Sequence, residues 1–481
     1  MASVSQARKL RDRALTRLPS AVGTIAGSVR RRIFEAKLRA ARPAELAELR
    51  ELERDERLDP ELLCALQQAR AAEIVRFAMS RSDFYRERYA RAGIQERDLS
   101  DPGAFRSLPV LERADVKEQF ERIRSADATP DNSQREVTGG TTNEPLRILR
   151  DARAQHRTLS WRLYRWWGVG PSENHAVIWR ETSFNRWRML RHDALWWPTR
   201  TLRMDVNAMD SAAVTAFIEG WSRIRPALLL GYVGAVIEVA RAIERSGRKL
   251  PPPKAVGTTA APISRAQKQY LAEIFGAPVY DTYQCMEVPM LAGECPAREG
   301  LHVFADCRLV EILDAAGRPV GPGETGSVVV TDFRNRVFPF IRYRLGDRAR
   351  WKQGACACGV TFPQLEPVRG RSTDSLRFPS GLVVSGDGIL EIFDAWPEAV
   401  RFFQIWQAAD YSLRLRCVPG KDPNAAVLMQ RGVERLRKVV RDEVPVRLEL
   451  IDAIEHDRGK QRIVVSEAPG ALAPRPHGAR R

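Results

Sequence analysis

Short apolar runs alternate with amphipathic segments through the middle of the chain. Four of these runs have the length and composition of buried strands: residues 176–179, 228–230, 255–258 and 278–281. The segments 235–246 and 265–275 place apolar residues at helical spacing. This alternation predicts an α/β fold with a parallel sheet covered by helices. Ligands of such sheets bind beyond the carboxyl ends of the strands, so residues 231–234, which we expect to form a turn, and 282–287 are candidate site segments.

The pattern changes on both sides of this region. Residues 60–95 repeat apolar positions at helical spacing, and another amphipathic helix is expected between residues 151 and 167. After residue 303 the apolar runs are short and separated by turns, which predicts antiparallel strands in a distorted β-barrel. These strands are expected at residues 308–313, 326–331 and 340–343. A smaller α+β unit follows, with strands at 383–385, 402–407, 412–418 and 446–451 and a helix at 424–443.

We therefore expect four units along the chain. Residues 1–59 form a basic arm with helical pieces, and residues 60–372 form the large layered domain. Residues 373–466 form a small mobile lid domain. Residues 467–481 are rich in Pro, Gly, Ala and Arg, a composition typical of disorder.

The net charge of +17 over 481 residues requires an explanation. Residues 1–50 contain twelve Lys or Arg and four Asp or Glu, so they supply close to half of the excess. A solvated basic arm explains this, and so does weak attraction to an anionic membrane. No nucleic-acid-binding motif is present, so we expect no nucleic-acid partner. Anionic substrates would account for part of the remaining charge.

Apolar runs and cysteine usage indicate the compartment. The uncharged segment 18–29 is too short to cross a bilayer and lacks a convincing cleavage site, so we expect a cytoplasmic protein. Seven cysteines are an odd number, which favours reduced thiols or a metal site over disulfides.

A threonine- and glycine-rich segment stands just before the predicted helix at 151. It contains Thr138, Gly139, Gly140, Thr141 and Thr142. A tight turn of this composition presents backbone N–H groups and hydroxyls together and can hold a polyphosphate. It is not a Walker loop, because no Gly-Lys-Ser/Thr follows. An ordinary surface loop is the alternative.

Three later segments could complete a nucleotide site. Tyr283 can stack on a purine, and Glu287, four residues on, can hold a divalent cation against phosphates. Asp347 follows a glycine turn and can accept the hydroxyls of a ribose. Lys460 follows a glycine in a polar loop and could meet negative charge that develops on phosphate. A surface Glu, a turn-capping Asp and a solvated hairpin are the respective alternatives.

Three cysteines and a histidine suggest a metal site. Cys295 and His302 precede Cys356 and Cys358 by about fifty residues. Three thiolates and one imidazole suit a closed tetrahedral zinc site. Reduced free thiols remain the alternative, because Cys-x-Cys is less typical of zinc than Cys-x2-Cys.

In this order the motifs resemble the adenylate-forming superfamily and, more narrowly, the phenylacetate–CoA ligase family with its capsule-biosynthesis branch. Residues 338–347, Phe-Pro-Phe-Ile-Arg-Tyr-Arg-Leu-Gly-Asp, nearly repeat the family's Phe-Pro-x-Ile-Arg-Tyr-Arg-Thr-Gly-Asp. Residues 138–145, 258–262, 283–287, 370–374 and 459–460 match five further family motifs. The resemblance covers about residues 60–466.

The resemblance implies a role for each matched position. Lys460, Glu287 and Thr141 would be catalytic, with Glu287 holding Mg²⁺ and Lys460 bridging the acyl carboxylate and the α-phosphate. Asp347 and Arg371 would hold the ribose. The phosphates would lie on Thr138, Gly139, Gly140, Thr141 and Thr142, and the adenine against Thr259, Ala260, Ala261, Tyr283, Gln284, Cys285 and Met286. The acyl pocket would include Tyr232, Val233 and Gly234. The lid would rotate about a hinge at residues 373–374.

Four positions depart from the family pattern. Asn143 and Gln284 replace glycines, Ala261 replaces a glutamate, and Thr373 replaces the hinge acid. The resemblance still implies ATP-dependent activation of a small carboxylic acid, most simply an aryl or bulky one, followed by transfer to CoA. The alternatives are adenylyl or acyl transfer to a non-CoA acceptor in polysaccharide or coenzyme biosynthesis, and a non-catalytic protein at the membrane periphery. A homodimer is also expected.

Overall fold

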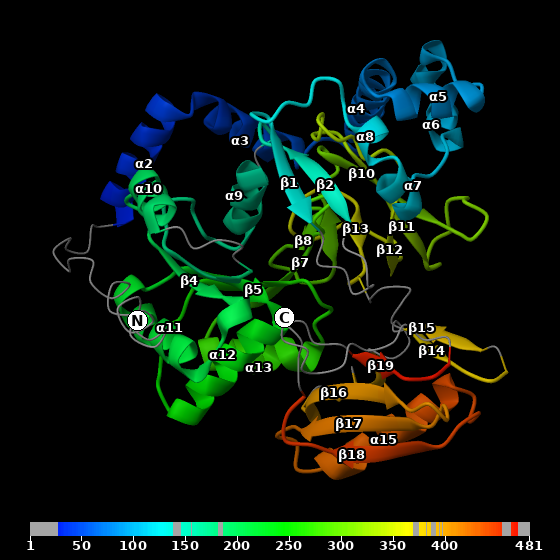
Figure 1. Cartoon of the computed structure of the whole chain (residues 1–481). Coiled ribbons are helices and arrows are strands. Elements are labelled where there is room, and N and C mark those ends of the chain that lie inside the picture. Colours follow the sequence, from blue (N-terminus) through cyan, green and yellow to red (C-terminus); the bar gives the residue numbers. More distant parts are fainter. Residues whose placement is uncertain are drawn as a thin grey trace, which may run out of the picture.

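The structure is a computed structural model. It describes residues 27–137, 146–154, 156–180, 186–368, 375–380, 382–385, 391–393, 395–396, 398–454 and 463–469. Figure 1 shows N-terminal helices along the top, a large sheet with its helices in the middle, and a smaller C-terminal unit below. No helix in these ranges combines the length and the apolar character needed to cross a membrane.

An eight-stranded sheet forms the centre of the molecule. Its order is β13 (Gln364–Leu365), β9 (Leu301–Val303), β8 (Ala292–Glu294), β7 (Val279–Tyr283), β6 (Ala255–Thr259), β5 (Leu228–Tyr232), β3 (His175–Trp179) and β4 (Thr201–Asp205). The strands from β7 to β4 are parallel, and β8, β9 and β13 extend the sheet in antiparallel fashion. The predicted α/β fold is confirmed, including all four predicted parallel strands.

Helices cover both faces of this sheet. Helices α11 (Ser211–Ile224), α12 (Val233–Ser246) and α13 (Arg265–Phe275) bury their apolar stripes in one core cluster with β3, β5 and β6. Leu159 and Leu163 of α9 (His156–Trp166) belong to a second cluster with Leu228 and Ala255. Burying these side chains removes apolar surface from water, and each Å² of apolar surface buried stabilises the packed layers by roughly 25 cal/mol.

Local sequence explains why α13 has the predicted bounds. Ser264 and Gln267 form a capping box at its start, in which each side chain accepts from the other residue's backbone N–H. Gly276 ends the helix in the left-handed conformation, which glycine adopts without steric cost. By contrast, the helix expected from residue 151 begins only at His156.

The antiparallel part contains β10 (Arg308–Leu313), β11 (Gly326–Asp332) and β12 (Tyr343–Ala349), paired in that order. An isolated bridge from Trp351 to Leu365 of β13 links this sheet to the end of the large one. The predicted strand at 340–343 is wrong, because β12 begins where that prediction ends. A hairpin of β1 (Ser133–Val137) and β2 (Arg147–Asp151) lies beside these sheets.

The N-terminal helices pack on the large domain. Leu52 of α3 (Pro43–Asp55) joins the α9 core cluster, and Arg162 of α9 donates to the Leu52 carbonyl at 3.2 Å. Arg162 also forms a fully buried ion pair with Asp306, at 2.5 Å. The remaining helices here are α2 (Gly27–Ala41), α4 (Pro60–Arg81), α5 (Asp83–Arg91), α6 (Pro102–Ser107), α7 (Arg113–Glu118), α8 (Phe120–Ile123) and the 3-10 turn η1 (Glu96–Ser100). The described part of the predicted basic arm is therefore anchored by α3.

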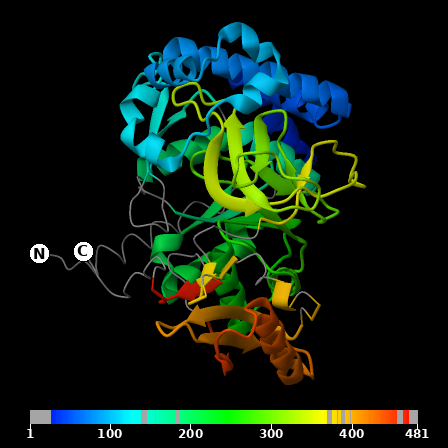
Figure 2. The same cartoon turned by 90° about the vertical axis from the view of Figure 1, so that its right-hand side faces the viewer.

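The C-terminal unit is a four-stranded sheet in the order β18 (Val446–Leu450), β17 (Leu413–Pro419), β16 (Val400–Gln407) and β19 (Val464–Ser466). Helix α15 (Ala425–Val439) shares a core cluster with these strands. A small hairpin, β14 (Ser375–Arg377) and β15 (Val383–Ser385), completes it. Figure 2 shows this unit below the large domain from a second side. The boundaries of the four predicted units remain predictions.

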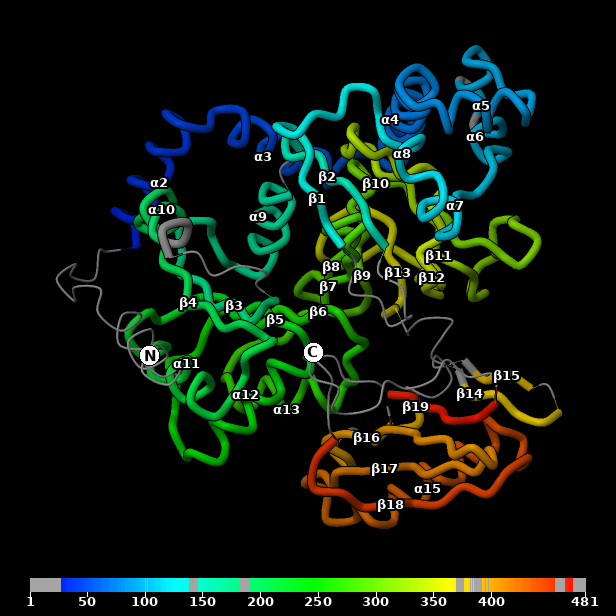
Figure 3. Tube along the Cα trace, viewed as in Figure 1, coloured from blue at the N-terminus to red at the C-terminus, as the bar shows by residue number. Residues whose placement is uncertain are grey.

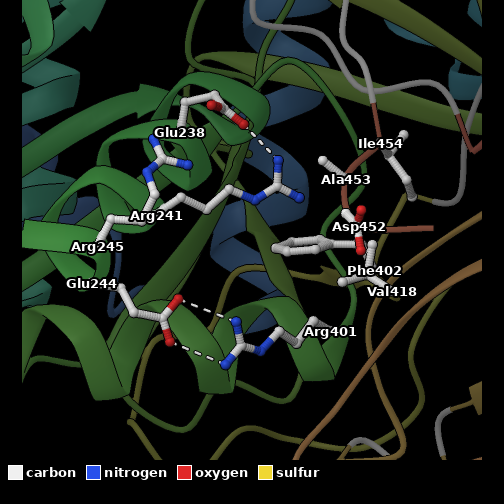
Figure 4. Close-up of a pocket in the computed structure, with 10 residues that line it drawn as sticks. All are labelled: Glu238, Arg241, Glu244, Arg245, Arg401, Phe402, Val418, Asp452, Ala453 and Ile454. Carbon is white, nitrogen blue, oxygen red and sulfur yellow. Dashed lines mark hydrogen bonds and ion pairs between the residues drawn. The ribbon is translucent and has the colours of Figure 1, made fainter. Parts of the chain in front are cut away.

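A seam joins the C-terminal unit to α12 and α13. Phe402 and Val418 are members of the α12–α13 core cluster, and Arg401 donates to both oxygens of Glu244, at 3.1 and 3.0 Å. Lys421 pairs with Glu273 of α13. A cavity of about 570 Å³ opens beside this seam (Figure 4). Its lining contains none of the predicted site residues.

Candidate active site

The carboxyl ends of the parallel strands form one edge, and the predicted site segments lie on it. Tyr232, the last residue of β5, is the direct neighbour of Thr259, the last residue of β6. The ring of Trp179, at the end of β3, lies 4.7 Å from the Tyr232 ring between centroids, tilted by 47°. The rings of Trp179 and Tyr232 thus lie next to the hydroxyl of Thr259 at this edge.

The predicted acyl-pocket residues divide into two groups. Residues 231–234 do not form a turn: β5 runs to Tyr232, and α12 begins at Val233 without a loop. Val233 is fully buried in the α12–α13 core, and Gly234 is buried in the first helical turn. The predicted turn is therefore wrong. Of the three predicted acyl-pocket residues, only Tyr232 places a side chain at the strand edge.

Threonine hydroxyls tie β6 and β7 together below this edge. Thr259 donates to the Thr282 carbonyl at 2.9 Å, and Thr282 donates to the Thr258 carbonyl at 2.9 Å. The Gln284 amide reaches the Thr259 hydroxyl at 3.4 Å. These bonds fix the spacing of the two strand ends that precede the predicted adenine segment.

The turn after β6 is strained. Ala260 has φ of 72°, in the left-handed region that residues with a Cβ seldom adopt. Such a conformation costs on the order of 1 kcal/mol and persists only where the surroundings enforce it. Ala260 is exposed and Ala261 is half-buried, so the strained backbone lies at the surface of the edge.

Tyr283 and Asp347 meet through a short hydrogen bond. The Tyr283 hydroxyl donates to Oδ2 of Asp347 at 2.6 Å. Asp347 does not follow a turn as predicted but lies inside β12, where Leu345, Gly346 and Asp347 stand opposite the single residue Val328. Gly346 has φ of 82°, so its glycine serves a β-bulge, which redirects neighbouring side chains. The bulge brings a strand carboxylate to the tyrosine.

Glu287 is buried, with 8% of its surface exposed, so the alternative of a surface glutamate is excluded. The Tyr343 hydroxyl donates to its Oε1 at 3.4 Å, and Arg113 of α7 approaches that oxygen at 3.9 Å. Burial raises the pKa of Tyr343, with Glu287 raising it further and Arg113 lowering it. Arg113 was missed in the sequence, whereas Tyr343 lies within the most specific motif.

The predicted phosphate cradle lies outside the described residues, and so do Arg371, Thr373 and Lys460. The strands that flank the cradle are described, and Val137 pairs with Arg147, so the cradle joins the two strands of a hairpin. Arg150 of β2 contacts the sulfur of Met286 at 3.9 Å. This contact places the hairpin beside the segment that carries Glu287.

Cys285 turns back onto its own segment. Its backbone N–H donates to the Val288 carbonyl at 3.4 Å, and its sulfur accepts from the Val288 N–H at 3.2 Å. These contacts hold the Cys285 side chain against its own segment, which was predicted to lie beside the adenine. Cys307 is buried near Arg334, and burial raises the pKa of its thiol to about 11, with Asp306 raising it further and the arginines lowering it.

Comparison with known proteins supports the family resemblance that the motifs indicated. No family model matches the chain. A phenylacetate–coenzyme A ligase of Thermus thermophilus is 25% identical over 381 residues, which cover 73% of this chain and 79% of the relative. A phenylacetate–coenzyme A ligase of Escherichia coli is 23% identical over 65% of this chain and 72% of its own length. In sequence, the chain is therefore similar to phenylacetate–CoA ligases.

Solved structures show the same fold for this phenylacetate–CoA ligase-like chain. A 2-hydroxyisobutyryl-CoA ligase in the postadenylation state, in complex with an adenylate, has a TM-score of 0.71 at 19% identity. The match covers 86% of this chain and 92% of that one. The fold is therefore that of the adenylate-forming CoA ligases, as the motifs implied.

A second cluster lies away from the strand edge: Cys295 directly follows β8, His302 lies in β9, and Cys356 and Cys358 lie in a later loop. One ligand atom from each of Cys295, His302, Cys356 and Cys358 lies within 4.8 Å of all the others. The sulfurs of Cys295 and Cys356 are 3.5 Å apart, and Nε2 of His302 is 3.4 Å from the sulfur of Cys358. Around a tetrahedral zinc ion, two sulfur ligands lie about 3.8 Å apart, and a sulfur and a nitrogen ligand lie about 3.5 Å apart.

The surroundings of this cluster suit a cation. Nδ1 of the fully buried His302 lies 2.9 Å from the Phe362 carbonyl. If that nitrogen donates, Nε2 keeps its lone pair toward the sulfurs. Burial raises the pKa of the Cys295 thiol to about 12 in the absence of a metal. A zinc ion would stabilise the thiolates that burial disfavours.

Proposed function

We propose that this protein is an ATP-dependent acid–thiol ligase that activates a carboxylic acid as its acyl-adenylate and transfers the acyl group to CoA. The observation that carries this proposal is that two motifs far apart in sequence, residues 283–287 and 338–347, meet at one end of the sheet. Tyr283 contacts Asp347, and Glu287 follows Tyr283 on the same segment. The names and adenylate or CoA complexes of the similar ligases support the same reaction.

The first half-reaction is an in-line displacement at phosphorus. A carboxylate oxygen of the acid attacks the α-phosphorus of ATP, and the bond to the bridging oxygen of pyrophosphate breaks. Asp347, oriented by the Tyr283 hydroxyl, would accept hydrogen bonds from the ribose hydroxyls, and Arg371 would donate hydrogen bonds to the ribose. Thr138, Gly139, Gly140, Thr141 and Thr142 would donate to the β,γ-phosphates, and Lys460 would offset the charge between the acid and the α-phosphate.

Glu287 would hold Mg²⁺. A buried carboxylate beside substrate phosphates is the usual protein share of a magnesium site, since this ion keeps waters and takes few side-chain ligands. Bound there, Mg²⁺ would neutralise charge that develops on the leaving pyrophosphate. The Tyr343 hydroxyl at 3.4 Å would hold the carboxylate in place.

The second half-reaction replaces AMP by a thiol. The CoA sulfur attacks the acyl carbon and loses its proton, and AMP leaves with the electron pair of the broken bond. We infer an aryl or bulky acid, because Trp179 and Tyr232 provide paired rings at the strand edge.

We also propose that Cys295, His302, Cys356 and Cys358 bind a structural zinc ion. All four ligands come from the protein, so no coordination position is left open for substrate. A cytoplasmic location, a role in capsular polysaccharide synthesis, a homodimer and weak contact of residues 1–50 with anionic membranes are proposals that rest on the sequence.

Pyrophosphate release tests the proposed ligase. The full-length protein is incubated with ATP and Mg²⁺ and a panel of aryl, branched and linear acids, with and without CoA. We expect release that depends on the acid, and a CoA thioester when CoA is present. Release without any thioester would favour transfer to another acceptor, and no release with any acid would favour a binding protein.

A further inference from the structure

Helices α2 and α10 (Arg186–Trp196) form one corner of the molecule. The Nζ of Lys37 donates to three carbonyls at the end of α10, those of Ala194, Leu195 and Trp197, at 3.2, 3.1 and 2.8 Å. A lysine there satisfies carbonyls that the helix leaves unpaired and offsets the negative end of its dipole. Phe34 of α2 packs near the Trp196 ring, at 6.3 Å between centroids. Figures 1 and 3 show the two helices side by side.

This corner exposes large apolar side chains. Among the residues that the structure describes, eight large hydrophobic side chains are exposed, and four of them lie on these helices or directly after them. Their exposed fractions are 46% for Val29, 39% for Leu190, 45% for Leu195 and 40% for Trp197. Single exposed apolar residues are ordinary, but their concentration on one corner marks an interaction surface.

The same corner is strongly basic. Helix α2 contains five basic residues and one acidic residue, and Glu35 already pairs with Arg31 and Arg39. Arg32 and, on α10, Arg191 are exposed. In the sequence, residues 1–26 contain five further basic residues and one acidic one. An anionic partner complements this charge.

The arginines of this corner differ in exposure, and Arg30 is partly buried. Its Nε is buried and has no hydrogen-bond partner among the described residues. Burial lowers the pKa of Arg30, and nearby Arg200 lowers it further while Glu173 raises it. Because this Nε atom is closed to solvent, Arg30 lies on the packed side of α2, and the exposed Arg32 and Arg191 are the side chains open to an anionic partner.

We propose that the α2–α10 corner, made of Val29, Arg32, Leu190, Arg191, Leu195 and Trp197, docks on an anionic lipid membrane. Arg32 and Arg191 contact headgroup phosphates, and the indole of Trp197 with the two leucines enters the interfacial layer, where amphipathic aromatic rings are favoured. The protein binds at the surface without crossing the bilayer. The sequence predicted weak attraction of residues 1–50 to an anionic membrane. The present proposal assigns this attraction to particular side chains of α2 and adds those of α10.

Other occupants fit less well. A twofold contact between two copies would place the same patch against itself and oppose like charges. A nucleic acid would satisfy the arginines but would leave the exposed Val29, Leu190 and Leu195 in water. The anionic membrane complements both features at once.

Vesicle sedimentation tests this surface without depending on ligase activity. The full-length protein is mixed with phosphatidylcholine vesicles, alone or with about one third phosphatidylserine. We expect sedimentation only with the anionic vesicles, weakening as salt rises. The double variant Arg32→Glu/Trp197→Ala should bind at least about tenfold more weakly, since each basic residue near the surface contributes about fivefold and the variant also reverses a charge.

A matched variant provides the control. Lys249→Glu/Leu62→Ala makes the same kinds of change at an exposed lysine and the 60%-exposed Leu62, away from the corner. This control variant should bind anionic vesicles almost as well as wild type, losing only the small contribution of the overall net charge. Equal binding by wild type to neutral vesicles, no binding to anionic vesicles at low salt, or equal losses in both double variants would overturn the proposal. A change of oligomeric state in the corner variant, or binding to duplex DNA without vesicle binding, would also overturn it.

Discussion

At the scale of single residues, the hydrogen bond from Tyr283 to Asp347 is the contact on which the candidate site most depends. It joins the end of β7 to a bulge in β12, two segments more than sixty residues apart in sequence. The tyrosine ring and the strand carboxylate can then face the two halves of one nucleoside. The geometry gives separate roles to the ring and to the hydroxyl of Tyr283.

Replacing Tyr283 by phenylalanine separates these roles. Tyr283→Phe keeps the ring but removes the donor that orients Asp347, and a hydrogen bond to a charged group contributes about 1.5–3 kcal/mol. We expect the KM for ATP to rise by about tenfold or more, measured by pyrophosphate release. Tyr89→Phe is the control, because the buried Tyr89 hydroxyl has no partner in the described part of the chain. An unchanged KM in Tyr283→Phe would show that Asp347 needs no such orientation.

Asp281 makes stability depend on pH. Burial raises the pKa of this β7 carboxyl to about 7, with Lys268 lowering it and Glu294 raising it. An unfolded aspartate titrates near 3.9, so the folded state holds the extra proton between roughly pH 4 and 7. The stabilisation from Asp281 is complete below the unfolded pKa and is lost as pH rises through about 7.

Asp281→Asn tests this linkage. Urea unfolding from pH 4 to 8 should show a smaller fall in the free energy of unfolding for the variant than for wild type. At pH 8 the variant should be at least as stable as wild type, because asparagine carries no charge to bury. Asp452→Asn, at an exposed carboxylate, should follow the wild-type curve. Parallel curves for Asp281→Asn and wild type would contradict the assignment.

At the scale of elements, the sequence predicted what local patterning determines. The bounds of α13 were correct because its cap residues are local, and β10 was correct because the turn at residues 314–317 directly follows its short, mostly apolar run. Gly346 was assigned to a turn because glycine suits both turns and bulges, and only its pairing with β11 distinguishes them. Trp179 and Arg113 had no local signal, since their roles depend on neighbours brought together by the sheet.

The cysteine–histidine cluster gives an element-scale prediction. It ties β8 and β9 to residues 356–358, so losing one ligand should release zinc and loosen that end of the sheet. We expect Cys358→Ser to lose bound zinc by mass spectrometry and to lower Tm by about 5 °C or more.

Cys64→Ser provides the matched control, because Cys64 is an exposed thiol away from the cluster. It should retain both the zinc and the wild-type Tm. The absence of zinc from wild-type protein purified without chelators, or an unchanged Tm after chelation, would refute the zinc site.

In the molecule as a whole, the residues of the candidate site come from several structural units. The parallel sheet provides Thr259 and Tyr283, the antiparallel sheet provides Asp347, and the segment between them provides Glu287. The segment that joins β18 to β19 contains Lys460, so the C-terminal unit contributes the proposed catalytic lysine. We propose that these units close around one ATP and one carboxylate.

Exchange of labelled pyrophosphate into ATP measures reversible acyl-adenylate formation and tests that claim most directly. We expect exchange that requires both a carboxylic acid and Mg²⁺, that falls at least about 100-fold in Glu287→Gln, and that persists in Glu434→Gln, a change at an exposed glutamate of α15. Acid-dependent exchange that proceeds equally well in Glu287→Gln and wild type would contradict the account.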